Sequence, residues 1–332
     1  MENRTTSVHP EVTHICKVAL ILFFLFMSGF SCSFALDIGF YDLSCPDAEF
    51  IVRTTVRSAA FNDATVPPKL LRLLFHDCFV EGCDASVLVE GEDTERDDPA
   101  NASLGGFEVI EAAKAEIEDF CPGIVSCADI LAMAARDAVA LTGGPDIQIP
   151  KGRLDGRVSA LSNVRPNLID TSFTVDTMIQ IFGSKGLSME DIVILSGAHT
   201  IGSAHCSVFD DRFKIDSNGN LTFCDSTLSK GYALSLGKKC SKSESEAVMT
   251  DPNTPFYFDN QYYKNLIAHR GLFQTDSELY ADQRTKNLVE QFANDSDRFY
   301  QGWSESFIKV SSIGVKTDSE GEVRQICSQI NG

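Results

Sequence analysis

The chain has 332 residues, of which 43% are hydrophobic and 23% are charged, as expected for one large globular unit or two closely packed lobes. Its formal net charge of -19 argues against nucleic acids and anionic polymers as partners. That charge places no limit on neutral or hydrophobic substrates.

The first 35 residues are predicted to be a cleaved signal peptide. Residues 18–30 are apolar apart from Ser28 and Gly29, and Ser33-Phe34-Ala35 supplies a site of small residues for cleavage. A run of about 13 residues is shorter than the roughly 20 that span a bilayer, so an uncleaved anchor is the less favoured alternative. No later segment is long and apolar enough to cross a membrane. We therefore expect residues 36–332 to be exported and free of the membrane.

Helical patterns dominate the rest of the chain. The segment 126–141 is apolar on nearly all sides, which predicts a central buried helix. Strand-like alternation is clearest at 147–150, and the less apolar stretch 216–245 predicts a long surface excursion. The predicted fold class is mainly α, with these further helices expected: 108–120, 174–185, 188–196, 258–269, 285–293 and 299–313.

Nine of the eleven cysteines remain after removal of the signal segment. In an exported chain that number favours disulfides over free thiols, and an odd count leaves at least one cysteine over. Their spacing does not fit a zinc site. Export also makes three sequons candidates for glycosylation, at Asn101, Asn220 and Asn294.

An arginine and a histidine share one face of a predicted helix that begins near Pro67-Pro68. Arg72 and His76 are four residues apart, among leucines and phenylalanines. A buried guanidinium needs a polar or anionic partner, and a base beside a permanent cation suits a reaction that moves a proton and stabilises developing negative charge. For such a pair taken alone, the favoured interpretation is an amphipathic helix with a solvent-reaching arginine and a structural histidine.

The residues after His76 offer oxygen ligands at short intervals. Carboxylates, carbonyls and a hydroxyl in a tight loop are what a calcium ion requires, although the spacing is not that of an EF-hand. Cys78 and Cys83 are close enough to staple this loop. The candidate ligands are Asp77, Val80, Gly82, Asp84 and Ser86.

A second histidine, His199, lies at the end of a predicted helix between Gly197 and Gly202. Glycines allow close approach of the backbone, for example to a flat macrocycle, and a histidine at a helix end is a reasonable ligand for haem iron. Taken alone, the same motif favours a buried structural histidine.

The segments LLRLLFHDCFVEGCDAS at 70–86 and LSGAHTIG at 195–202 together resemble the two signatures of the secretory plant haem peroxidases, called class III. The resemblance extends from about Phe40 to Cys327. It implies a two-lobed helical fold with very little β structure. One haem b would lie between a distal lobe (about 36–173 with 304–332) and a proximal lobe (about 174–303). It also implies two calcium ions, a monomer, and oxidation of small phenolic donors by hydrogen peroxide in one-electron steps.

The resemblance assigns a role to each matched residue. Arg72 would polarise bound peroxide, His76 would move its proton from one oxygen to the other, and His199 would bind the haem iron. Three more residues follow: Phe75 as a wall of the haem site, Asp276 as the acceptor of the second N–H of His199, and Pro166 at the haem edge where aromatic donors dock. A second calcium site would comprise Thr200, Asp251, Thr254, Tyr257 and Asp259.

The cysteines and one ion pair are matched in the same way. Cys224 is the cysteine left over, and Asp129 with Arg153 would form a buried structural ion pair. The disulfides implied by the family are Cys45–Cys121, Cys78–Cys83, Cys127–Cys327 and Cys206–Cys240.

The chain departs from the family pattern at residues 99–103, where many relatives carry an asparagine that accepts the N–H of the distal histidine. A gapless match places Ala100 there, whereas a loop one residue shorter would bring in Asn101, with Glu95 as its outer partner. Asn101 cannot both carry a glycan and orient a buried histidine, and we predict that it faces the distal pocket.

Three functional hypotheses remain from the sequence. The favoured one is a secreted peroxidase of the apoplast or cell wall, with the vacuole less favoured and the physiological donor open. The altered loop motivates a catalytically weak, calcium-braced extracellular glycoprotein. An intracellular ascorbate or cytochrome peroxidase is opposed by the signal segment and the cysteines.

Overall fold

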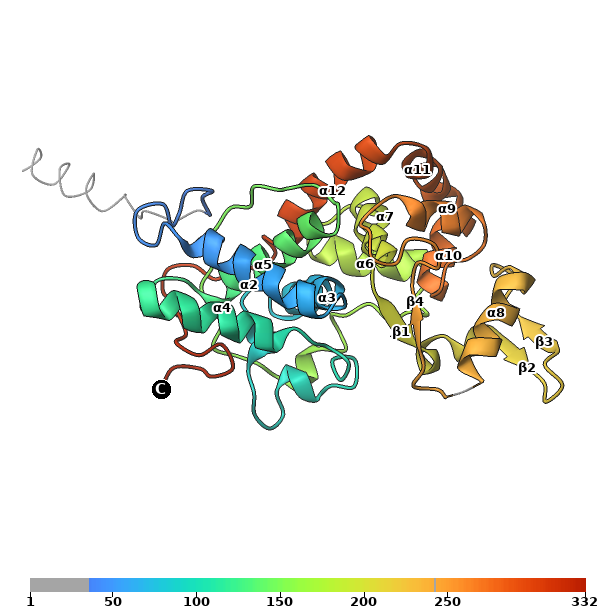
Figure 1. Ribbon diagram of the computed structural model, residues 1–332, viewed down its shortest axis with the longest axis horizontal. Coiled ribbons are helices and arrows are strands. Elements are labelled where there is room, and N and C mark those ends of the chain that lie inside the picture. Colours follow the sequence, from blue (N-terminus) through green and yellow to red (C-terminus); the bar gives the residue numbers. More distant parts are fainter. Residues whose placement is uncertain (1–35, 242) are drawn as a thin grey trace, which may run out of the picture. The chain divides into compact units, whose positions relative to one another are not determined.

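The computed structural model describes residues 36–241 and 243–332, so the predicted signal peptide lies outside the described residues (Figure 1). The mainly α fold class is confirmed. None of the helices in the described ranges is long and apolar enough to span a membrane. The α-helices are α2 Ala48–Asn62, α3 Val66–Val80, α4 Phe107–Phe120, α5 Cys127–Leu141, α6 Val175–Ser184, α7 Met189–Ser196, α8 Lys230–Cys240, α9 Gln261–Ile267, α10 Gln274–Ala281, α11 Gln283–Asn294 and α12 Ser296–Val310.

The described residues form two small antiparallel sheets. Strand β1 (Ser203–His205) pairs with β4 (Ala247–Met249), and β2 (Phe213–Ile215) pairs with β3 (Leu221–Cys224). The expected strand at 147–150 is wrong: within the described ranges this segment pairs with no strand, and only the following Lys151 forms an isolated antiparallel bridge, with Asp37. Its two isoleucines are nevertheless buried, so the alternation marked burial of an extended segment and not sheet pairing.

The stretch 216–245 is more structured than a surface excursion. It contains β3 and helix α8, whose N-cap Ser229 accepts a hydrogen bond from the backbone N–H of Tyr232. Tyr232, Ala233 and Leu236 are buried in a small second core with residues of β2 and β4. Because this small core needs only a few apolar residues, the composition of the stretch did not indicate that it is packed.

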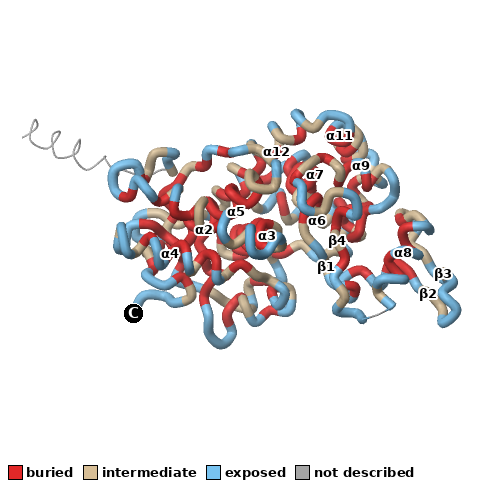
Figure 2. The backbone as a smooth tube through the Cα atoms, in the orientation of Figure 1, coloured by how far each residue is buried: buried red, intermediate tan, exposed pale blue. Residues whose placement is uncertain are grey.

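Helix α5 lies at the centre of the main core, as expected (Figure 2). Residues 127–139 are all buried, and α5 packs against α2, α3 and α4. Asp129 lies in the first turn of this helix, 2.7 Å from the Arg153 guanidinium, and both side chains are fully buried. Tyr41 donates a further hydrogen bond to Asp129 at 2.7 Å. These partners compensate the carboxylate inside the core.

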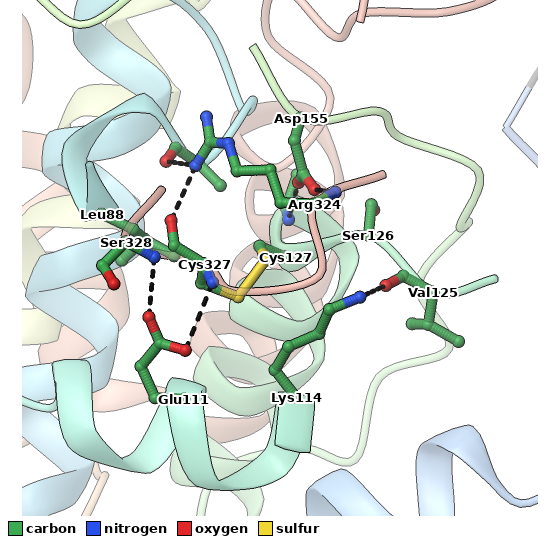
Figure 3. Close-up of a disulfide and its surroundings, with 12 residues drawn as sticks. Leu88, Glu111, Lys114, Val125, Ser126, Cys127, Asp155, Arg324, Cys327 and Ser328 are labelled. Atoms are coloured by element: carbon green, nitrogen blue, oxygen red, sulfur yellow. Dashed lines mark hydrogen bonds between the residues drawn. A yellow bond between two sulfur atoms is a disulfide. The ribbon is translucent and has the colours of Figure 1, made fainter. Parts of the chain in front are cut away.

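The C-terminal segment is fastened to the main core by a disulfide and several hydrogen bonds (Figure 3). Glu111 accepts from the backbone N–H groups of Cys327 (3.2 Å) and Ser328 (2.7 Å). The buried Arg324 donates to the carbonyls of Ala85 (2.8 Å) and Gly156 (2.6 Å). The segment therefore braces the loop that carries the distal calcium candidates. Residues 36–241 and 243–332 contain four disulfides, Cys45–Cys121, Cys78–Cys83, Cys127–Cys327 and Cys206–Cys240, and leave Cys224 as a thiol.

Candidate active site

Helix α3 carries the arginine and the histidine of the distal segment. Its first turn contains Pro67 and Pro68. Proline has no backbone N–H, and none is needed there because the N–H groups of a first turn have no acceptor within the helix. Arg72 Nε donates to His76 Nε2 at 3.2 Å, and the rest of the guanidinium donates to Ala100 O (3.0 Å) and Ser103 Oγ (2.9 Å). Within the described ranges Arg72 has no carboxylate partner. Its positive charge is therefore fixed in direction and available to an anion.

His76 is held in one tautomer by Asn101. The His76 Nδ1–H donates to Asn101 Oδ1 at 2.6 Å, and the orientation of that amide is set because Asn101 Nδ2 donates to the Glu95 carbonyl at 2.7 Å. Burial, and then the charge of Arg72, lower the pKa of His76 to about 3 although the Asn101 contact acts in the opposite direction. His76 is thus a neutral imidazole with its basic nitrogen beside a fixed cation.

The structure brings the side chain of Asn101, and not that of Ala100, to His76. Asn101 is only 4% exposed and its amide has partners at both ends, contacts that a glycan on its nitrogen would disrupt. Asn220 and Asn294 are exposed and remain candidates for glycosylation. Ala100 contributes through its carbonyl, which accepts from Arg72.

The distal calcium candidates form a buried cluster of oxygens with a deficit of positive charge. Asp77 and Asp84 are each 1% exposed, and burial together with Asp84 and Glu95 raises the pKa of Asp77 well above its ordinary value. Ser86 Oγ and both carboxylate oxygens of Glu95 are buried without a hydrogen-bond partner among the described residues. Val80 and Gly82 lie in the same turn at the end of α3. Such a set fits a calcium ion.

His199 lies in the 3-10 turn Gly197–Thr200 that follows α7. Its Nδ1–H donates to Asp276 Oδ1 at 2.7 Å, while its side chain stays 39% exposed. Asp276 also accepts from the Tyr262 hydroxyl at 2.9 Å and from the Phe273 backbone N–H at 2.9 Å. Burial acts to raise the pKa of Asp276, but His199 and these hydrogen bonds hold it below its ordinary value.

The arrangement around His199 fits an iron ligand. Its Nε2 has no hydrogen-bond partner in the described part of the chain, and a carboxylate on the other nitrogen is the usual support of a metal-binding histidine. At Gly197 a side chain would collide with Tyr263 and Phe299, so packing within the protein requires glycine there. Gly202 has a φ of +105°, a conformation that favours glycine.

The second set of calcium candidates also converges. Thr200 Oγ1 lies 3.1 Å from Asp259 Oδ1, and Thr254 Oγ1 lies 3.2 Å from Asp251 Oδ2. Tyr257 belongs to the same turn, since its backbone N–H donates to the Thr254 carbonyl at 3.0 Å. In the described residues no three His, Cys, Asp or Glu side chains are placed so that they could hold a metal ion by themselves, so each set would add hydroxyl or carbonyl oxygens to two aspartates. That mixture favours calcium over zinc.

Two expected residues lie at the margin of the site. Phe75 is half-buried on α3, with its ring centroid 6.0 Å from that of His76. Pro166 is exposed, and the neighbouring Arg165 forms an ion pair with Asp98 at 2.9 Å. Asp98 in turn accepts from the Ala100 backbone N–H at 2.8 Å, so this ion pair braces the loop that carries Asn101.

Sequence reasoning missed three contributors to these contacts. Ser103, through its hydroxyl, and the Arg165–Asp98 pair fix the loop beside Arg72, and Tyr262 shares the carboxylate of Asp276. A serine and an ion pair in a polar loop carry no distinctive signal. The pair Tyr262-Tyr263 in a predicted helix could have been noticed as a source of buried hydroxyl groups.

Comparisons with known proteins agree with this geometry. The model of the peroxidase family matches residues 52–295. The chain is 57% identical to Peroxidase 18 of Arabidopsis thaliana over 98% of both chains. It is 56% identical to Peroxidase 46 of Arabidopsis thaliana, covering 95% of this chain and 98% of that one. Peroxidase 5 of Vitis vinifera is 43% identical, over 89% of this chain and 92% of its own. The chain therefore belongs to the peroxidase family, in the plant class III group that its two histidine segments resemble.

Proposed function

We propose that the protein is a secreted haem peroxidase that uses hydrogen peroxide to oxidise small phenolic donors one electron at a time. The observation that carries this proposal is the neutral His76, whose Nδ1–H is fixed by Asn101 and whose Nε2 lies 3.2 Å from Arg72 Nε. When bound, haem supplies the two-electron reduction of peroxide and the one-electron oxidation of donors.

The residues of the chain move the proton and stabilise the charge. His76 Nε2 accepts the proton of one peroxide oxygen and delivers it to the other. A neutral imidazole can do both within one catalytic cycle, because it is a base before it accepts the proton and an acid afterwards. The Arg72 guanidinium, fixed by Ala100 O and Ser103 Oγ, stabilises negative charge on the departing oxygen. On the opposite segment, Asp276 orients His199 and increases its basicity toward iron.

The finer features of the proposal are one haem b and two calcium ions per chain, and a monomeric enzyme. The oxygen clusters around Asp77 and Asp251 support two calcium ions. Four disulfides support export, because they persist in oxidising compartments. We assign the enzyme to the apoplast or cell wall, where it would act on wall phenolics, with Pro166 beside the donor.

A Soret band in the purified protein, followed by guaiacol oxidation with hydrogen peroxide, tests this proposal. His76→Leu should reduce the rate constant for the reaction with peroxide by roughly 10²- to 10⁴-fold, the range of general acid–base catalysis. His205→Leu is a matched control, because His205 is an exposed histidine on β1. Absence of haem, or full activity of His76→Leu, would contradict the assignment.

The catalytically weak alternative makes a different prediction. It expects haem and calcium to bind without turnover, and the loop at residues 99–103 was its motivation. The contact of Asn101 with His76 removes that motivation. Mass spectrometry of the secreted protein provides a direct check, because a glycan on Asn101 would be incompatible with this contact.

A further inference from the structure

Two adjacent tyrosines on α9 direct their hydroxyl groups to different acceptors. Tyr262 donates to Asp276 Oδ1 at 2.9 Å. Tyr263 donates to the backbone carbonyls of Val193 at 3.1 Å and Ile194 at 3.3 Å, in helix α7. Both side chains are buried, at 3% and 0% exposure. The pair therefore offers two phenols that are buried to a similar extent, of which only Tyr262 contacts the partner of His199.

Tyr262 competes with His199 for the same oxygen atom. Asp276 Oδ1 accepts from His199 Nδ1 at 2.7 Å and from the Tyr262 hydroxyl at 2.9 Å, whereas Oδ2 accepts from the Phe273 backbone N–H at 2.9 Å. Each donor draws negative charge from the carboxylate, so less remains to attract the proton of His199. The phenol is the one side-chain competitor of His199 for Asp276 in the described structure.

The surroundings make this competition effective. Asp276 is 2% exposed, so water does not screen its contacts. The Tyr262 ring lies edge-on to the His199 ring, with centroids 5.9 Å apart, and Phe273 flanks it at 5.1 Å. Packing thus fixes the phenol, the carboxylate and the imidazole in one geometry.

We propose that Tyr262 is a positioning residue that weakens the pull of Asp276 on the His199 proton and thereby sets how much imidazolate character His199 presents to iron. This inference rests on the proposed haem peroxidase function. Without the phenol, Asp276 Oδ1 would serve His199 alone, and the imidazole would become a stronger donor. A stronger donor favours ferric over ferrous iron.

The test compares Tyr262→Phe with Tyr263→Phe in the haem-loaded enzyme. Both changes delete one buried hydroxyl and keep the ring, but only the first removes a donor from Asp276. We expect Tyr262→Phe to raise the ferrous iron–histidine stretching frequency in resonance Raman spectra. We also expect it to increase the preference for ferric iron about tenfold, which lowers a one-electron potential by about 59 mV. Tyr263→Phe should leave both readings at the wild-type value.

A fluorinated tyrosine at position 262 tests the same contact with the opposite sign and without loss of the hydroxyl. Its more acidic phenol is a stronger donor, so the stretching frequency should fall and the potential should rise. The inference is overturned if Tyr262→Phe equals wild type in both readings, or if Tyr263→Phe shifts them equally. A wild-type protein that takes up no haem would instead overturn the proposed function, whereas an active enzyme with unresponsive variants would overturn this inference alone.

Discussion

Replacement of Asn101 by alanine removes the acceptor of the His76 Nδ1–H and the donor to the Glu95 carbonyl, at 2.6 and 2.7 Å. Asn101 is 4% exposed, so both groups lose their partner inside the protein. Each unsatisfied buried group costs about 1–3 kcal/mol, and we expect Asn101→Ala to lower the free energy of unfolding by roughly 2–4 kcal/mol, since water entering the gap restores part of the loss.

The same change should slow the reaction with peroxide without abolishing it. The proton of His76 would no longer be fixed on Nδ1, and imidazoles protonated on Nε2 cannot accept the proton of peroxide. Arg72 Nε still donates to Nε2, which favours the productive tautomer. We therefore expect a decrease of about 10- to 100-fold, as for other groups that orient a functional histidine.

Stopped-flow measurement of the haem-loaded enzyme with hydrogen peroxide gives this rate constant directly. Asn163→Ala is the matched control, because that amide donates to Glu81 and does not contact His76. It should change the rate by less than about twofold, as expected for a substitution outside the catalytic groups. A wild-type rate in Asn101→Ala would refute the role of Asn101, as would an equal loss in the control.

Three further predictions concern stability. Burial acts to raise the pKa of Asp191, but Lys309 and hydroxyl donors dominate and lower it to about 2. The loss of stability caused by Asp191→Asn should therefore reach its full size only above about pH 4. That difference should shrink as the pH falls from about 3.8 toward 2, and urea midpoints that differ equally at pH 6 and pH 2.5 would contradict it. Chelation of calcium should lower the melting temperature by roughly 8 °C, restored by Ca²⁺ but not by Mg²⁺, if the two ions together contribute about 4 kcal/mol. An unchanged melting temperature would exclude structural calcium. Replacing both Cys127 and Cys327 by alanine opens a link across 200 residues and should cost about 5 kcal/mol; a loss below about 2 kcal/mol would count against the loop-entropy estimate.

Much of the helical fold could be predicted because its signals are local. Ser188 caps α7 and forms a reciprocal pair with Asp191, and Ser126 caps α5, so both helices begin where the sequence indicated. The segment 126–141 is apolar on nearly all sides, which places that helix in the core without knowledge of its neighbours. The expected helix 258–269 is shorter in the structure, since Asp259 turns back to accept from the Gln261 backbone N–H at 2.8 Å.

The remainder depended on contacts that sequence patterns do not encode. Helix α10 was not predicted because it has only eight residues and a polar sequence, and its Asp276 accepts from the Phe273 backbone N–H at the helix start. The choice between Ala100 and Asn101 required the loop conformation, which the Arg165–Asp98 ion pair helps to fix. The acceptors of the Tyr262 and Tyr263 hydroxyls depend on which helix lies opposite each ring.

The two histidines illustrate how one contact can serve two purposes. Each donates its Nδ1–H to a side-chain oxygen at nearly the same distance, 2.6 Å for His76 and 2.7 Å for His199. The acceptor of His76 is a neutral amide, which fixes the tautomer but adds no charge, so the imidazole remains free to take up and release a proton. The acceptor of His199 is a carboxylate, which transfers negative charge to the ring and suits a permanent bond to iron. The chemical difference between the two sites therefore depends on the acceptor of the Nδ1–H, which is Asn101 for His76 and Asp276 for His199. In our proposal the Tyr262 phenol reduces this difference, because it draws negative charge from Asp276.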